Sequence, residues 1–129
     1  MKIASFNING IKARIQLLKE WLKKENPDII GLQELKSDNS NLNKDMFADL
    51  GYSFAYNGQK SYNGCGILSK HEIKNTSYFF NGIQEDPQKR WISAEINGIL
   101  ICNLYLPNGN PLGTEKFEYK IHWMDLLYN

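Results

Sequence analysis

The first third of the chain carries two hydrophobic periodicities, one after the other. Residues 2–8 alternate between two faces as a β-strand does, and apolar residues recur at helical spacing over 11–22. Asn9-Gly10 separates these two segments, and Asn26-Pro27 ends the helical one. The apolar run 28–33 predicts a second strand, so the three segments predict a βαβ unit whose two strands are parallel.

Beyond residue 42 the pattern changes towards β-structure. The segment 42–50 first predicts one short helix, which Gly51 would end. Asn97-Gly98 lies between two alternating segments and is a strong signal for a hairpin turn. The predicted strands are residues 52–57, 64–69, 73–80, 90–96 and 99–105.

A last helix is predicted after a loop at 107–113. It begins near Thr114 and would bury Phe117, Ile121 and Met124, which recur at spacings of four and three. No Gly or Pro ends this helix before Asn129, so we interpret the chain as interrupted within or just after it.

Composition limits the class of protein but says little about its partners. The chain has 129 residues, of which 42% are hydrophobic and 22% charged, so we expect one globular unit or part of one. The net charge of +1 gives no electrostatic argument for a nucleic-acid partner. No apolar run reaches the roughly 18 residues of a membrane span, and the N-terminus lacks a signal-peptide pattern. We therefore expect a cytoplasmic location, with Cys65 and Cys102 as reduced thiols of the core; a disulfide between them is the alternative.

Asn7 and Glu34 lie at the carboxyl ends of the two predicted parallel strands. Ligands of open α/β sheets bind at this edge. A carboxylate and an amide oxygen that converge there suit Mg²⁺ together with phosphate and water. The alternative is that Asn7 caps the following turn and Glu34 is an exposed strand end.

Four segments occur in an order that resembles a known family. They are SFNINGIKAR, PDIIGLQELK, YNGQKSYNGCGILSK and NLYLPNGN. Together they are similar to the sequence blocks of the exonuclease III and AP endonuclease branch of the endonuclease/exonuclease/phosphatase superfamily. The resemblance extends from Met1 to about Trp123, which is nearly the whole chain.

The resemblance implies an α+β fold, namely half of a four-layer α/β/β/α sandwich with one mixed β-sheet and flanking helices. Residues 1–129 would form the N-terminal part of this domain. The family's Gly-Asp-Phe-Asn segment and its terminal Asp-His pair are absent from the sequence. We expect one apolar sheet face to lack its cover, which the missing C-terminal half or self-association would have to supply.

The resemblance also assigns roles to individual residues. Glu34 matches the principal metal ligand, Asn7 an active-site asparagine near the metal, and Tyr105 the active-site tyrosine beside the scissile phosphate. The implied cofactor is Mg²⁺, with Mn²⁺ as an alternative. Asn108 would contact the substrate, whereas the amide of Asn9 stands where some relatives have an acid and is doubtful as a ligand. For Tyr105 the alternative is a tyrosine of a β-rich core.

Five further side chains are candidates for contact with DNA. Cations and amides in loops beside the metal edge could bind phosphates, and a tyrosine could pack on a sugar or base. These candidates are Lys36, Lys60, Tyr62, Asn63 and Arg90. A solvated surface position is the alternative for each, and Arg90 could instead hold a structural ion pair. His71 and His122 lack the family's Ser-Asp-His setting, so we expect them to be structural or surface residues.

The function implied by the resemblance is Mg²⁺-dependent hydrolysis of DNA phosphodiesters in base-excision repair. The substrate would be double-stranded DNA, cut at abasic sites or shortened from 3′ ends. Without the proton-transfer residues of the second half, we expect the isolated chain to be inactive. The alternatives are a non-catalytic nucleic-acid-binding module and a truncated gene product without function.

Overall fold

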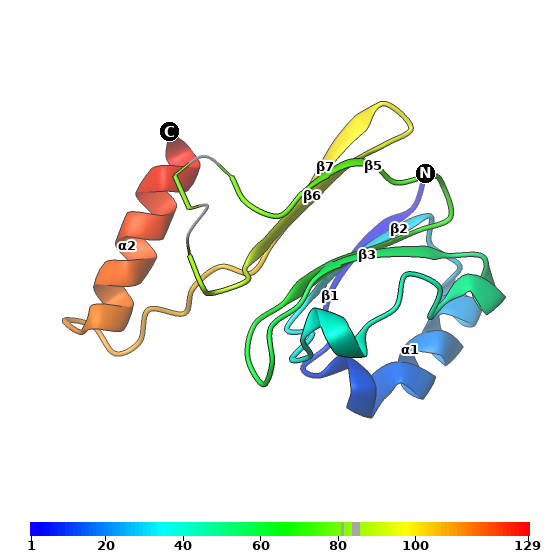
Figure 1. The fold of residues 1–129 in the computed structure, drawn as a ribbon, viewed down its shortest axis with the longest axis horizontal. Coiled ribbons are helices and arrows are strands. Elements are labelled where there is room, and N and C mark those ends of the chain that lie inside the picture. The colour runs from blue at the N-terminus through cyan, green and yellow to red at the C-terminus, as the bar shows by residue number, and fades with distance from the viewer. Residues whose placement is uncertain (81, 84–85) are drawn as a thin grey trace.

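The computed structural model describes residues 1–80, 82–83 and 86–129, and it contains two β-sheets that pack face to face (Figure 1). Helix α1 (Ile11–Glu25) covers the outer face of the first sheet, and helix α2 (Glu115–Tyr128) stands beside one end of the second (Figure 1). In the described part of the chain, neither helix has the length and apolar character that a membrane crossing requires.

The predicted βαβ unit is confirmed. Strands β1 (Ile3–Asn7) and β2 (Ile29–Gln33) are parallel neighbours, and α1 connects them. The helix buries Ile11, Leu18 and Leu22 against the sheet, as their spacing predicts. It ends at Asn26, which adopts the left-handed conformation and donates its backbone N–H to the carbonyl of Leu22.

The α+β class is confirmed and the expected mixed sheet is present, but a second, antiparallel sheet that was not expected packs against it. The first sheet has the order β1-β2-β4-β3, with β3 at Ser53–Asn57 and β4 at Cys65–Ser69. The second has the order β5-β6-β7, with β5 at Lys74–Ser77, β6 at Trp91–Ile96 and β7 at Ile99–Leu104. Asn97 and Gly98 have φ angles of 53° and 73° and form the predicted hairpin turn between β6 and β7.

Two hydrophobic cores explain the separation into two sheets. One core lies between α1 and the first sheet. The other lies between the sheets and joins Ile29, Cys65 and Ile67 to Ile92, Ala94 and Ile96. The second sheet therefore covers the apolar face of the first that was expected to be bare.

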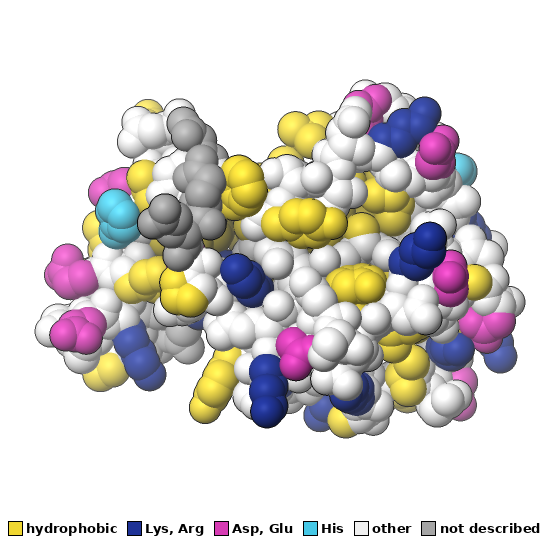
Figure 2. Space-filling model, in the orientation of Figure 1, with side chains coloured by type: hydrophobic (Ala, Val, Ile, Leu, Met, Phe, Trp, Pro, Cys, Tyr) yellow, Lys and Arg dark blue, Asp and Glu magenta, His cyan; other side chains and the backbone are white. Residues whose placement is uncertain are grey.

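Exposed apolar side chains remain on several elements, among them α2 and the strands β1 and β7, each of which has one neighbour in its sheet among the described residues. Ile3 and Phe6 of β1 are 54% and 43% exposed, and Ile99 and Leu100 of β7 are 47% and 67% exposed. On the face seen in Figure 2, acidic and basic side chains are interspersed without one extended basic patch, as expected for a net charge of +1.

The predicted helix over 42–50 is wrong. Two 3₁₀ turns, η1 (Asn39–Asn41) and η2 (Ala48–Leu50), lie here with irregular chain between them. The side chains of Asp38 and Asn43 accept hydrogen bonds from the backbone N–H groups of Ser40 and Asp45. Such local bonds compete with helical ones, so the chain follows turns. Gly51 ends η2 with a φ of 82°.

Helix α2 forms where predicted, after Thr114, but its buried face differs. Trp123 is buried, whereas Ile121 and Met124 are 40% and 42% exposed and Phe117 is half-buried. The helix packs against Phe80, whose ring centre lies 5.1 Å from that of Trp123, and so it does not lie across a sheet. Trp123 is buried because it lies on the side of α2 that faces Phe80. The apolar spacing of Phe117, Ile121 and Met124 does not decide which residues are buried.

Candidate active site

The carboxyl ends of β1 and β2 bring two polar side chains together. Asn7 ends β1 opposite Gln33, the last residue of β2, and Glu34 follows directly. The Nδ2 atom of Asn7 donates a hydrogen bond of 3.0 Å to Oε1 of Glu34. The predicted meeting of these residues at one sheet edge is therefore observed.

Tyr105 reaches the same carboxylate from the second sheet. It directly follows β7, and its backbone N–H donates to the carbonyl of Arg90, which continues the ladder between β6 and β7. Its hydroxyl donates to Oε1 of Glu34 over 2.6 Å. Glu34 thus accepts two hydrogen bonds on one oxygen, from residues on both sides of the gap between the sheets.

These contacts fix the charges of the site. Hydrogen bonds from Tyr105 and then from Asn7, with a smaller contribution from Lys36, hold the pKa of Glu34 below its usual range. Burial, followed by the bond to Glu34, raises the pKa of the Tyr105 hydroxyl. At neutral pH the site therefore holds an ionised carboxylate beside a protonated phenol.

Lys36 is the cation of this group. Its ammonium lies 3.4 Å from Oε2 of Glu34 and donates to Oδ1 of Asn9 over 2.6 Å. Asn9 is thereby bound to a cation, which agrees with the doubt about it as a metal ligand.

The backbone around Glu34 is strained. Glu34 and Lys36 have φ angles of 54° and 52°, a left-handed conformation that side chains other than Gly, Asn and Asp rarely adopt. The loop before β4 supports them, because the backbone N–H of Leu35 donates to Gly64 and that of Lys36 to Asn63. Such strain persists where the surrounding structure holds it, often at functional sites.

Arg90 lies against the same tyrosine, and not in an ion pair. Its guanidinium lies 4.8 Å from the ring centre of Tyr105 and donates to the carbonyl of that residue. Its Nε atom donates to Gln88, and the ring of Tyr119 lies 5.8 Å away. In the described part of the chain, the structural ion pair considered as an alternative for Arg90 is not found.

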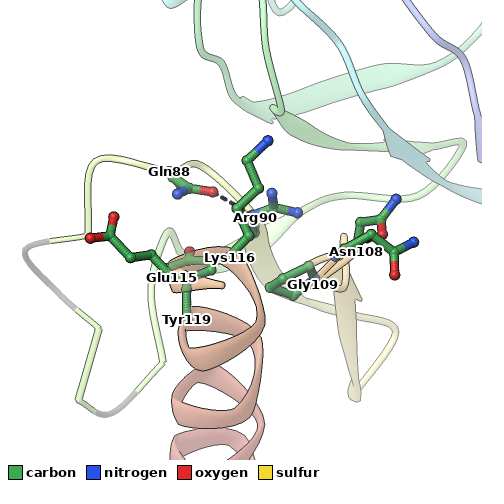
Figure 3. Close-up of a pocket in the computed structure, with 9 residues that line it drawn as sticks. Gln88, Arg90, Asn108, Gly109, Glu115, Lys116 and Tyr119 are labelled. Carbon is green, nitrogen blue, oxygen red and sulfur yellow. Dashed lines mark hydrogen bonds between the residues drawn. The ribbon is translucent and has the colours of Figure 1, made fainter. Parts of the chain in front are cut away.

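A polar pocket of about 450 Å³ opens beside Arg90 (Figure 3). In Figure 3 Arg90 lies between Gln88 on one side and the loop with Asn108 on the other, above the first turn of α2. Lys116 also lines this pocket and adds a second cation. Asn108 therefore shares a pocket with Arg90, as expected for residues that bind one substrate.

The other predicted contacts are more scattered. Tyr62 is 69% exposed in the loop before β4. The side chain of Asn63 is nearly buried and donates to Gln59 over 3.1 Å, so its amide serves the loop itself. His71 faces Asp28 at 3.5 Å, and His122 is an exposed residue of α2.

Sequence reasoning missed Gln88, Lys116 and Tyr119. Gln88 stands two positions before Arg90, so in an extended segment both side chains point to the same side. This spacing could have identified Gln88 from the sequence. Lys116 and Tyr119 reach the pocket only because α2 folds back beside residues 86–90, where Tyr119 donates to Asp86. The spacing of residues along the chain does not predict that contact.

The described residues contain no group of three or more His, Cys, Asp and Glu side chains that could hold a metal ion. Glu34 still suits Mg²⁺, which commonly uses one or two carboxylates and fills its other positions with water and phosphate oxygens. Among the described contacts, its Oε2 atom has the ammonium of Lys36 as partner, at 3.4 Å. Asn7 turns its nitrogen to Glu34 and its oxygen to the backbone N–H of Asn9, so the amide would have to turn over to bind a metal.

The chain is similar to known proteins in both sequence and fold. The sequence profile described as the endonuclease/exonuclease/phosphatase family matches residues 4–128. An exodeoxyribonuclease III of Haemophilus influenzae is 39% identical over 125 residues, which are 93% of this chain and 47% of that protein. An AP endonuclease of Archaeoglobus fulgidus superposes with a TM-score of 0.93 at 37% identity, covering 99% of this chain and 49% of that one.

A second similar structure contains DNA. It is a 3′ phosphatase from Neisseria bound to a product DNA hairpin, with a TM-score of 0.93 and 34% identity over 98% of this chain and 49% of that one. The chain thus spans about half the length of the relatives it matches. These matches confirm the resemblance drawn from the four sequence blocks.

Proposed function

The chain belongs to the endonuclease/exonuclease/phosphatase family, and from that premise we propose that it forms the metal-binding half of a Mg²⁺-dependent DNA phosphodiesterase of the exonuclease III and AP endonuclease type. One observation carries the proposal. Glu34 is held ionised at the edge of two parallel strands by Tyr105 and Asn7, which come from different sheets.

Glu34 would hold Mg²⁺ through Oε2, or Mn²⁺ in its place, and Asn7 would join it only after its amide turns over. When bound, the metal would supply Lewis-acid charge that neutralises the substrate phosphate.

Tyr105 and Lys36 would act on the same phosphate. The Tyr105 hydroxyl keeps its proton at neutral pH because its pKa is raised, so it can donate a hydrogen bond. Passing that bond from Glu34 to a phosphate oxygen would stabilise the charge that develops there. Lys36 sits on the other oxygen of Glu34 and adds a second positive group.

Arg90 and Asn108 would bind the flanking part of the substrate. Together with Lys116 they line the pocket of Figure 3, where cations and an amide suit the sugar-phosphate chain next to the reacting phosphate. Tyr62 is exposed enough to pack on a sugar or base, and Asn63 would act mainly through the loop that carries Tyr62.

The substrate class follows from the relatives. An AP endonuclease, an exodeoxyribonuclease III and a 3′ phosphatase bound to DNA all match the chain. We therefore propose double-stranded DNA with abasic sites or 3′ ends as substrate. The proposed location is the cytoplasm, which Cys65 and Cys102 suit because both are free thiols.

We propose that a second polypeptide half is needed for activity. In the described residues, neither histidine contacts Glu34 or Tyr105, so a proton-transfer group has to come from elsewhere. Strands β1 and β7 each have one free edge, with exposed Ile3 and Phe6 on one and Ile99 and Leu100 on the other. Strands added to these edges would cover that apolar surface. Self-association through the same edges is the competing way to cover it.

Reconstitution tests the proposal. The 129-residue chain is mixed with a polypeptide equivalent to the remaining half of the relatives and assayed on a duplex with one abasic site, with and without Mg²⁺. We expect the chain alone to cleave at least about 10²-fold more slowly than the mixture, because a positioned proton donor is missing. Glu34→Ala in the mixture should abolish the Mg²⁺-dependent cleavage.

Other outcomes separate the alternatives. Binding of the duplex without cleavage in either sample, measured across a salt series, would favour a nucleic-acid-binding module. Robust cleavage by the chain alone that Glu34→Ala abolishes would contradict the need for a second half. Cleavage that survives Glu34→Ala would contradict the assignment of the site.

A further inference from the structure

Glu34 and Tyr105 belong to different sheets, so their separation depends on how the sheets are joined at this point. Glu34 follows β2 of the first sheet, and Tyr105 follows β7 of the second. Their hydrogen bond of 2.6 Å tolerates little relative movement, because such a bond weakens steeply as its atoms separate. Apolar packing between sheets resists separation but has no direction. A directional link is needed near these two residues.

Asn103 provides that link. It lies on β7, two positions before Tyr105, so both side chains point into the space between the sheets. Its Nδ2 atom crosses this space and donates to the carbonyls of Leu32 on β2 and Gly66 on β4, each over 2.8 Å. Both of these acceptors belong to the first sheet.

Gln33 completes the link from the other side. It is the last residue of β2 and directly precedes Glu34. Its Nε2 atom donates to Oδ1 of Asn103 over 2.6 Å and to the hydroxyl of Ser5 on β1 over 3.1 Å. Asn103 and Gln33 are 6% and 9% exposed, so water can hardly replace these bonds.

Gly31 leaves space on β2 for the side chain of Asn103. A Cβ atom at residue 31 would lie 2.9 Å from Oδ1 of Asn103, which is closer than real Cβ contacts come, and 3.0 Å from its Cγ, which is tighter than most of them. The glycine thus allows the amide to sit directly against β2. The close approach belongs to the same stretch of β2 that ends at Glu34.

We propose that Asn103 and Gln33 are positioning residues, whose hydrogen bond between the sheets sets the separation of Glu34 and Tyr105. This inference rests on the proposed function. The geometry that it concerns exists without substrate, metal or the second half. A buried amide that joins the sheets elsewhere can serve stability alone. Asn57 of β3 offers the comparison, since it is likewise 6% exposed and donates to the carbonyl of Tyr78 and, across the sheets, to that of Trp91 on β6.

NMR of the 129-residue chain with tyrosine labelled by ¹³C at Cζ tests the proposal. The chemical shift of this carbon at fixed neutral pH reports the hydrogen bond of the hydroxyl. Tyr105→Phe identifies the resonance among the seven tyrosines, and Glu34→Gln gives the shift expected when the carboxylate acceptor is lost. The test variants are Asn103→Leu and the milder Gln33→Met, which keeps most of the side-chain volume. Asn57→Leu is the matched control.

We expect the Tyr105 resonance to move in Asn103→Leu and Gln33→Met in the direction given by Glu34→Gln, and to stay in place in Asn57→Leu. Urea unfolding of each variant identifies conditions in which it is folded, and should Asn103→Leu not fold, Gln33→Met alone decides. An unmoved resonance in the folded test variants overturns the proposal, as does an equal movement in Asn57→Leu. Because the measurement involves no cleavage, its failure is distinct from a failure of the proposed nuclease function.

Discussion

The hydroxyl of Tyr105 donates to the carboxylate of Glu34 over 2.6 Å, although the two residues are 71 positions apart in the chain. This bond joins the two sheets at the edge where the predicted catalytic residues meet. The pKa of Glu34 therefore depends on Tyr105, and the pKa of the Tyr105 hydroxyl depends on Glu34. Four measurable consequences follow from this and from the surrounding fold.

Tyr105→Phe should raise the pKa of Glu34 towards the usual value of a glutamate. The hydrogen bond from Tyr105 is the largest cause of the lowered pKa, and phenylalanine removes it without removing the ring. The pKa is measured by NMR titration of ¹³C-labelled glutamate carboxylates. Tyr56→Phe is the control, because the Tyr56 hydroxyl donates only to the carbonyl of Leu42 among the described contacts. An unchanged Glu34 pKa in Tyr105→Phe would show that the bond is absent in solution.

Glu34 should make the fold sensitive to acid. Its pKa in the folded chain is lower than the ordinary value of 4.5, so the ionised form stabilises the folded state above that pH. This stabilisation is lost as the pH falls through the folded-state pKa. Urea unfolding between about pH 7 and about pH 3 should show a smaller loss of unfolding free energy in Glu34→Gln than in the parent chain. Glu20→Gln, an exposed substitution within α1, is the control; an equal effect of both substitutions would contradict the prediction.

Ile67→Ala should destabilise the chain by about 2–5 kcal/mol, because it leaves a cavity between the two sheets. Ile67 is fully buried, opposite the apolar side chains of β6. Leu100→Ala removes the same kind of side chain at a position that is 67% exposed, and should change the unfolding free energy by no more than about 0.5 kcal/mol. The comparison is made by urea unfolding. Similar values for both variants would mean that the sheets are not packed together in solution.

The two cysteines should differ in their reaction with a thiol reagent. Burial raises the pKa of Cys65 to about 12, and this side chain is fully buried. Cys102 is exposed on β7, so the expectation of a core thiol is wrong for this residue, although partial burial also raises its pKa. In Cys102→Ser the remaining thiol should react only on unfolding, and in Cys65→Ser it should react in the folded chain. Slower reaction of Cys102 after addition of the second half would support pairing at the free edge of β7; an unchanged rate would count against it.

The elements that the sequence predicted well are those set by neighbouring residues. The βαβ unit depends on one helical face that begins at Ile11 and on a left-handed Asn26 at its end, and the hairpin depends on Asn97-Gly98. The meeting of Asn7 and Glu34 follows from parallel pairing alone. Each of these features needs information from at most about one supersecondary unit.

The features that the sequence did not predict depend on contacts between distant segments. Alternation marks strands 91–96 and 99–104 but does not say which sheet they join, and so two sheets were taken for one. The apolar residues of α2 have a clear spacing, yet Phe80 selects Trp123 as the buried one. The role of Asn103 in joining the sheets became visible only with Leu32 and Gly66 beside it.

At Glu34 and Lys36 the left-handed backbone conformation favours one kind of residue for stability, and binding at the site requires another. A residue with a Cβ atom in this conformation costs roughly 1–2 kcal/mol, which glycine would recover. A library of variants screened for heat resistance alone should therefore enrich glycine or asparagine at Lys36, and it would discard the ammonium of the site. At Glu34 the loss of the hydrogen bonds from Tyr105 and Asn7 opposes the same gain. A screen for more stable variants of this protein therefore also has to measure binding at the carboxyl ends of β1 and β2.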